Sequence, residues 1–216
     1  MKHRVFVAGG TGYIGRQLLP RLLERGHVVR ALARQGSESK VPGGCEVTVG
    51  DPFDRRSFAG AIPPCDTFVQ LVGVPHPSPR KARAFVEIDL ASARESIGAA
   101  RDAAVAHFVY VSVAQPAPVM VAYQKARRTA EDLLAGAALT RTILRPWYVL
   151  GPGHRWPYLL LPAYALLETL PSTRDSARRL GLVTLPQMVA ALVHAVEHPP
   201  VSSRIVDVPE IREMSA

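Results

Sequence analysis

A strand, a glycine-spaced turn and a helix start open the chain, and this feature most constrains the fold. In "RVFVAGGTGYIGRQLL", Gly9, Gly12 and Gly15 follow the spacing G-x-x-G-x-x-G. The first glycine permits a tight turn, the second lets backbone N–H groups approach a pyrophosphate, and the third lets the helix pack on the strand. The helix also directs its positive end at the phosphates. We therefore predict dinucleotide binding by residues Gly9, Gly10, Thr11, Gly12, Tyr13, Ile14 and Gly15.

Short β-rich runs alternate with helical patterns over all 216 residues, which is typical of parallel strands joined by crossover helices. The predicted fold is a doubly wound, Rossmann-type α/β domain covering residues 1–216, with 151–182 as a small lid or substrate region. The predicted strands are 4–8, 27–32, 46–50, 66–72, 107–112, 140–145 and 204–208. The predicted helices are 13–25, 54–60, 80–104, 119–135, 157–169 and 185–197.

Composition excludes several classes of function. The net charge is +8, but the cations are scattered and no basic run is interleaved with aromatics, so nucleic-acid binding is not expected. No apolar run is long enough to span a membrane. Cys45 and Cys65 are far apart and lack metal-site spacing, so we expect no metal and a reducing cytoplasm.

The end of the second predicted strand bears on the type of dinucleotide. An acidic residue there would bind ribose hydroxyls, whereas a cation would bind a 2'-phosphate. The sequence "ALARQGSES" supplies Arg34 and no acid before Glu38, which favours NADP(H) over NAD(H), although an arginine can also simply solvate a loop. Asp51, after the third strand, would accept from the adenine amino group or cap a helix.

The pieces "GGTGYIG", "LVGV", "FVYVS" and "TRTILRPWYVLGPG" together resemble short-chain dehydrogenases/reductases, of the NmrA-like and NAD-dependent epimerase-like group. The resemblance implies a catalytic Ser, Tyr and Lys, matched here by Ser112, Tyr123 and, at the lysine position, Arg127. It also places Val72, Gly73 and Pro146 at the cofactor. An arginine keeps a positive charge beside the phenol but does not release a proton.

Helix geometry decides which cation serves Tyr123. Residues four apart share a helix face and residues two apart do not, so Arg127 is the expected neighbour and Lys125 is not. Glu131, a further four residues on, is expected to pair with Arg127. Alternative interpretations are that Tyr123 wedges the helix against the cofactor, that Ser112 only bonds the strand end, and that Arg127 with Glu131 is a surface pair.

Other residues are weaker candidates. His76 and His154 fall in loops expected near the cofactor, and Trp147, Tyr148 and Trp156 would supply an aromatic wall. Residues 155–171 are apolar on more than one face, which indicates burial, a lid, a dimer contact or an apolar substrate wall. The small residues Ala122, Ala126 and Ala130 would let their helix approach a partner subunit in a homodimer, or its own core.

Two functions follow. The first is an NADP(H)-dependent oxidoreductase that acts on a small apolar carbonyl or quinone-like substrate. Ser112 would polarise the carbonyl, Tyr123 would donate the proton, and Arg127 would hold the charge and the ribose. The second is a cofactor-binding sensor or assembly protein without turnover, and the arginine at the lysine position favours it.

Overall fold

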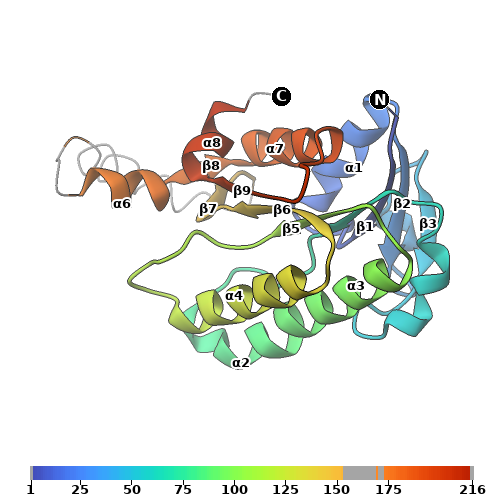
Figure 1. Ribbon diagram of the computed structural model, residues 1–216, viewed down its shortest axis with the longest axis horizontal. Helices are drawn as coiled ribbons and strands as arrows, with labels where there is room; N and C mark the ends of the chain where they lie inside the picture. The colour runs from blue at the N-terminus through green and yellow to red at the C-terminus, as the bar shows by residue number, and fades with distance from the viewer. Residues whose placement is uncertain (1, 153–168, 170–172, 215–216) are drawn as a thin grey trace.

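Seven parallel strands form the centre of the computed structural model, which describes residues 2–152, 169 and 173–214 (Figure 1). Their order is β3-β2-β1-β4-β5-β6-β9, and every neighbouring pair is parallel. The strands are β1 (Arg4–Ala8), β2 (Val28–Ala33), β3 (Glu46–Val49), β4 (Thr67–Gln70), β5 (His107–Val111), β6 (Thr140–Arg145) and β9 (Ser203–Asp207). The predicted doubly wound, Rossmann-type fold is confirmed.

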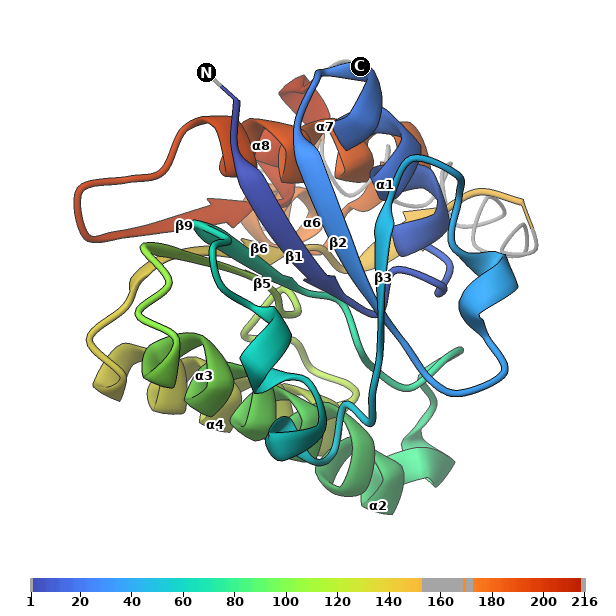
Figure 2. The same ribbon diagram turned by 90° about the vertical axis from the view of Figure 1, so that its right-hand side faces the viewer.

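Helices cover both faces of the sheet. On one face lie α1 (Gly15–Glu24), α7 (Leu185–Glu197) and α8 (Val208–Glu213) (Figures 1 and 2). On the other lie α2 (Ala82–Ala84), α3 (Ala91–Asp102) and α4 (Val121–Gly136). A π-helical segment, η5 (Phe85–Leu90), joins α2 to α3. The helix α6 (Arg174–Arg179) projects away from the sheet (Figure 1).

Each face of the sheet has its own apolar core. Along β1, Val5 and Val7 belong to the cluster formed with α1 and α7, whereas Phe6 and Ala8 belong to the cluster formed with α3 and α4. All four side chains are fully buried. A strand covered on both faces needs apolar residues at every position, which explains the continuous run "VFVA".

The predicted elements differ from the structure where elements are short. The predicted helix 54–60 is instead two 3₁₀ turns, Arg55–Ser57 and Ala59–Ala61. A second, two-stranded parallel sheet pairs β7 (Tyr148–Leu150) with β8 (Leu182–Thr184), and neither strand was predicted. The same is true of α6 and α8. The predicted helix 157–169 falls outside the described residues except for Thr169.

The sheet order creates one position where the connections diverge. From β1 the chain passes to β2 on one side, and β4 flanks β1 on the other. In open α/β sheets, ligands bind outside the carboxyl ends of the strands at such a switch point. The glycine turn after β1 and the "LVGV" loop after β4 meet there.

A buried histidine at the start of β5 makes stability depend on pH. His107 is 1% exposed, and its Nε2 lies 2.9 Å from Thr142 Oγ1. Burial lowers the pKa of His107 from 6.5 to about 4. The unfolded chain therefore binds a proton in a window where the folded chain does not, so stability is lost as the pH falls from 6.5 toward 4.

We expect His107 to remove about 2 kcal/mol of unfolding free energy between about pH 8 and pH 5. Urea unfolding at the two pH values measures this difference in unfolding free energy. The His107→Gln variant is expected to lose that part of the pH slope. Glu197, whose pKa Arg25 holds at about 2, contributes only at lower pH. An unaltered slope in His107→Gln would contradict the assignment.

Candidate functional site

The glycine turn after β1 forms a cradle of bare backbone. Gly9 has a φ of +85°, and a Cβ there would lie 2.8 Å from backbone atoms of both Leu71 and Val72, in the loop after β4. A Cβ on Gly15 would lie 2.4 Å from the carbonyl oxygen of Gly9. Gly15 is also the first residue of α1, so the helix N-terminus faces the turn. This cradle fits a dinucleotide pyrophosphate.

The remaining residues of the turn hold it in place. Arg16 Nε donates to the carbonyl oxygen of Thr11 at 2.8 Å, and Gly12 N donates to Gly9 O at 3.0 Å. Tyr13 directs its hydroxyl toward Gly151, where an added Cβ would lie 2.2 Å from that oxygen. The turn is thereby packed against the end of β7.

The residues expected at the adenosine end lie at the ends of β2 and β3. Arg34 directly follows β2 and is exposed, and no residue in the described part of the chain forms an ion pair with it. Asp51 Oδ1 accepts from Phe53 N at 2.9 Å, while the Ser57 hydroxyl accepts from Asp51 N at 2.9 Å. Asp51 therefore orders the turn after β3, in the manner of a cap.

Tyr123 and Arg127 meet on the inner side of α4, as the helix geometry predicts. The Arg127 guanidinium carbon lies 5.1 Å from the centroid of the Tyr123 ring, while Lys125 is exposed. Tyr123 also packs on Phe85, with ring centroids 4.8 Å apart. A cation above a phenol ring is attracted to it and anchors both groups.

The partner predicted for Arg127 was wrong. Arg127 does not pair with Glu131; its Nη2 donates to Asp89 Oδ1 at 2.5 Å, and its Nη1 donates to the Val111 carbonyl at 2.8 Å and to the Tyr110 hydroxyl at 3.3 Å. Both members of the pair are buried, with Arg127 6% exposed and Asp89 1% exposed. Arg127 Nε, also buried, has no hydrogen-bond acceptor among the described residues.

Glu131 belongs to a second buried cluster. Its carboxylate accepts from Arg145 Nη2 at 2.5 Å, from Gln115 Nε2 at 3.0 Å and from the Ser112 hydroxyl at 2.5 Å. Ser112 is 2% exposed. In this structure Ser112 therefore orders the Glu131–Arg145 pair, and no contact joins it to Tyr123 among the interactions of the described residues.

Burial raises the pKa of the two tyrosine side chains beside Arg127, Tyr110 and Tyr123. It raises the pKa of Tyr123 above its ordinary value, and the charge of Arg127 opposes that rise. Burial likewise raises the pKa of Tyr110 to about 12. Tyr123 is therefore protonated at neutral pH, as a proton donor must be.

The other predicted residues that the structure describes lie in the segments that follow β4 and β6. Val72 and Gly73 are half-buried in the loop after β4, and Pro146, which is buried, accepts from Ala114 N at 2.9 Å. Trp147 and Tyr148 meet edge to face, with ring centroids 5.7 Å apart. His76 is exposed. His154 and Trp156 lie outside the described residues.

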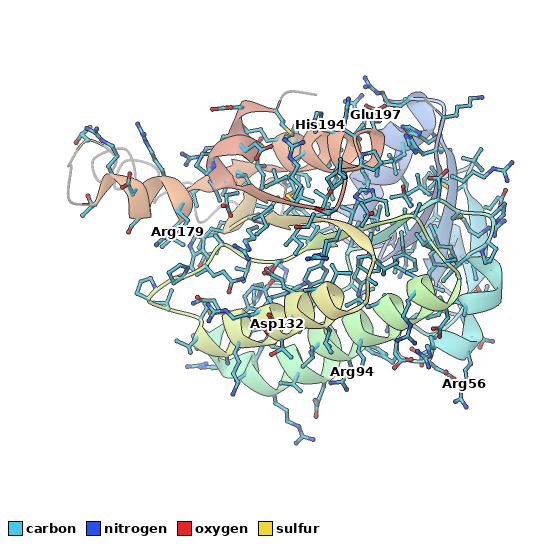
Figure 3. The ribbon with its side chains drawn as sticks, in the orientation of Figure 1. Arg56, Arg94, Asp132, Arg179, His194 and Glu197 are labelled. Carbon is cyan, nitrogen blue, oxygen red and sulfur yellow. The ribbon has the colours of Figure 1, made fainter. Side chains whose placement is uncertain are left out.

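A groove of about 510 Å³ lies elsewhere, between α1 and α7. Its walls include Arg21, Val189, His194 and Glu197, the last two labelled in Figure 3 on α7. That face of the sheet is opposite α4, which carries Tyr123 (Figure 1). The groove is therefore separate from the tyrosine cluster, and we do not assign the chemistry to it.

The described residues were compared with the requirements of a metal site and of a membrane-spanning helix. Within them, no three or more His, Cys, Asp or Glu side chains are grouped to hold a metal ion. In that same part of the chain, no helix combines the length and apolar character that crossing a bilayer requires. Cys45 and Cys65 are both free thiols.

Comparison with known proteins also indicates nucleotide binding. The sequence pattern of the NAD(P)H-binding family matches residues 9–156. The chain belongs to this family. Among solved structures, the NAD(P)H-binding protein resembles a Bordetella bronchiseptica enzyme in complex with NAD⁺, with a TM-score of 0.70, 18% identity and coverage of 94% of this chain and 75% of the other. It also resembles Thermus thermophilus UDP-glucose 4-epimerase in complex with NAD, with a TM-score of 0.68, 18% identity and coverage of 97% and 81%.

Curated relatives of this NAD(P)H-binding protein include reductases. A ceramide reductase of Caulobacter vibrioides is 26% identical over 88% of this chain and 59% of its own length. A farnesyl-dihydroquinoline-oxide ketoreductase of Stigmatella aurantiaca is 28% identical over 68% of this chain and 51% of its own length. The chain thus spans between half and six tenths of the length of these two relatives.

Sequence reasoning missed Asp89, Tyr110 and Arg145, the three side chains that complete the two buried clusters of the NAD(P)H-binding protein. One signal was available for Asp89. In "FVEIDL" it follows Phe85 by four residues and so shares its buried helix face, where an acid requires a partner. Tyr110 and Arg145 lie on strands, and their partners come from sequence-distant α4.

Proposed function

We propose that the protein is an NADP(H)-dependent oxidoreductase that acts on a small apolar carbonyl or quinone-like substrate. The observation that carries the proposal is the Tyr123–Arg127 pair, which the hydrogen bond from Arg127 to the Val111 carbonyl holds at the carboxyl end of β5. A protonated phenol beside a nucleotide cradle provides a proton donor for carbonyl reduction. The names of the curated relatives, which include ceramide and farnesylated quinoline reductases, support an apolar substrate.

In the proposed reaction, different residues would bind the cofactor, donate the proton and polarise the substrate. When bound, the nicotinamide nucleotide supplies the hydride, and the cradle of residues 9–15 orients it. Tyr123 would release the phenol proton to the substrate oxygen, and Arg127 Nε, which has no acceptor among the described residues, would donate to a ribose hydroxyl. The polarising role predicted for Ser112 requires its hydroxyl to exchange the Glu131 carboxylate for a carbonyl oxygen.

Substrate recognition would fall to the aromatic wall and to residues 151–182. Trp147 and Tyr148 are half-buried beside the end of β6. The assignment of 151–182 as a lid or substrate region stays a prediction, since 153–168 and 170–172 lie outside the described residues. A cytoplasmic location and a homodimer also stay predictions. Within the alanine stripe, Ala126 and Ala130 pack into the core, while Ala122 is exposed.

A two-step experiment tests the proposal. NADPH and NADH are first titrated into the purified chain, and binding is measured by the rise in melting temperature, because a ligand that binds the folded state stabilises it. Loss of reduced-nicotinamide absorbance is then followed with a panel of aliphatic, steroid-like and quinone-like carbonyls. Binding followed by turnover of an apolar carbonyl supports an oxidoreductase.

The second candidate is a nucleotide-binding sensor or assembly protein without turnover. The buried Asp89 carboxylate on Arg127 favours it, because this charge opposes the activation of the phenol that a lone cation would provide. The same experiment separates the candidates. Binding of NADPH without turnover of any panel member would contradict the oxidoreductase and support the sensor.

Preference for NADP(H) is expected to depend on Arg34. A charge-assisted hydrogen bond to phosphate contributes about 1.5–3 kcal/mol, so Arg34→Ala is expected to weaken NADPH binding by about 10- to 100-fold. NADH lacks the 2'-phosphate, and its affinity for the variant serves as the internal control. Calorimetric titration of both nucleotides makes the measurement. Equal loss of NADPH and NADH affinity would contradict 2'-phosphate recognition by Arg34.

A further inference from the structure

Three segments that are distant in sequence converge on the Arg127 guanidinium. Arg127 comes from α4, Asp89 from the π-helical segment η5, and Gly73 from the loop after β4. A Cβ on Gly73 would lie 2.5 Å from Arg127 Nη2 and 3.0 Å from Asp89 Oδ1. The bare backbone of that loop therefore lies directly on the ion pair.

Asp89 ties this arrangement together. Its Oδ1 accepts from Arg127 Nη2 at 2.5 Å, and its Oδ2 accepts from Val74 N at 3.1 Å. One carboxylate thus fixes both the cation and the loop that borders the switch point. Single π-helical turns occur often at functional sites, and this one also supplies Phe85, which packs on Tyr123.

Among the described residues, three charged or titratable groups act on Tyr123. Arg127 comes from its own helix, Asp89 from η5 and Tyr110 from β5. The remaining neighbours in its cluster are apolar, and they include Val74, Ile88 and Met120. Removal of the Asp89 charge would leave Arg127 as the dominant charge on the phenol.

We propose that Asp89 is a positioning residue: its carboxylate neutralises Arg127 and holds the guanidinium over the Tyr123 ring. The Asp89–Arg127 pair then replaces the single lysine of the family's catalytic set with a buried unit of no net charge. This inference rests on the proposed function for its catalytic meaning, but the electrostatic relation between Asp89 and Tyr123 holds without turnover. The consequence is that Tyr123 stays in its phenol form at alkaline pH.

The test is a titration of Tyr123 that needs no substrate. The chain has six tyrosines, so the tyrosinate absorbance of each protein is compared with that of its Tyr123→Phe counterpart, and the difference isolates one phenol. In Asp89→Asn, the Tyr123 transition is expected to move to lower pH by about 1 unit or more, the size of effect that an adjacent unpaired cation produces. Asp89→Glu keeps the charge and is expected to titrate as the unaltered protein does.

An Asp89→Asn transition that coincides with that of the unaltered protein would overturn the proposal. If Asp89→Asn does not fold, the titration of the unaltered protein provides the test. The proposal then requires the Tyr123 transition to occur at a higher pH than that of free tyrosine. A Tyr123 transition at a lower pH than that of free tyrosine would also overturn the proposal. Failure of the proposed function is separable. Absence of turnover on the carbonyl panel leaves the titration result intact, whereas turnover with an unshifted Asp89→Asn transition removes only the role of Asp89.

Discussion

Replacement of Gly15 by alanine is expected to weaken nucleotide binding strongly, by about 10- to 100-fold. The added Cβ would lie 2.4 Å from Gly9 O and 2.5 Å from Gly10 O, and both are backbone atoms that move only if the turn changes shape. Overpacking that forces such a shift costs about 1–3 kcal/mol, and about 1.4 kcal/mol corresponds to a tenfold change in affinity. The expected loss is therefore about 10- to 100-fold for NADPH and NADH alike, measured by calorimetry.

Gly43→Ala is the matched control for this variant. Apart from Gly43 and its two chain neighbours, no described residue has an atom within 4 Å of a Cβ placed on Gly43, so the same chemical change meets open space there. Its nucleotide affinity is expected to equal that of the unaltered protein. Circular dichroism and melting temperature show whether Gly15→Ala remains folded. A folded Gly15→Ala variant with unchanged affinity would remove the cradle from the nucleotide site, and the proposed function with it.

The second large effect is expected from Tyr123→Phe. This change removes only the hydroxyl and keeps the ring between Phe85 and Arg127, so packing and nucleotide binding should survive. General acid catalysis by a positioned side chain contributes about 10²- to 10⁴-fold, and kcat is expected to fall by that factor on any substrate the panel identifies. NADPH affinity, measured separately, is expected to stay the same.

Lys125→Ala supplies the control for Tyr123→Phe. Lys125 is two residues along the same helix but exposed, so the loss of its charge should not reach the phenol. Full kcat is expected in this variant. Equal turnover in Tyr123→Phe and the unaltered protein would exclude the phenol as the proton donor, even if nucleotide binding were shown.

The sheet could be predicted because its signals are local. Residues 4–8 and 140–145 match β1 and β6 at both ends, and 185–197 matches α7 at both ends. Each of these elements is long or strongly patterned. The strands β7 and β8 are short, and their pairing joins residues more than thirty positions apart, from Tyr148↔Leu182 to Leu150↔Thr184. No local pattern reports such a contact.

The electrostatics of the site were predictable only in part. Helix periodicity correctly placed Arg127, and not Lys125, beside Tyr123. The same rule wrongly paired Arg127 with Glu131, because the i,i+4 preference describes solvated helix surfaces where no other partner competes. In the folded protein both residues are buried, and sequence-distant ions lie closer, namely Asp89 for Arg127 and Arg145 for Glu131. Desolvation makes such pairing obligatory, and tertiary structure chooses the partners.

The ladder between β7 and β8 has a consequence for the segment between the two strands. Because Tyr148–Leu150 pairs with Leu182–Thr184, the chain departs from the nucleotide-binding scaffold and rejoins it within one short sheet. The entropy of closing an excursion grows slowly with its length, so insertions between these strands burden the scaffold little. Under the proposed function, the segment between these strands could therefore change in length or sequence while the seven-stranded sheet and its glycine turn stay the same.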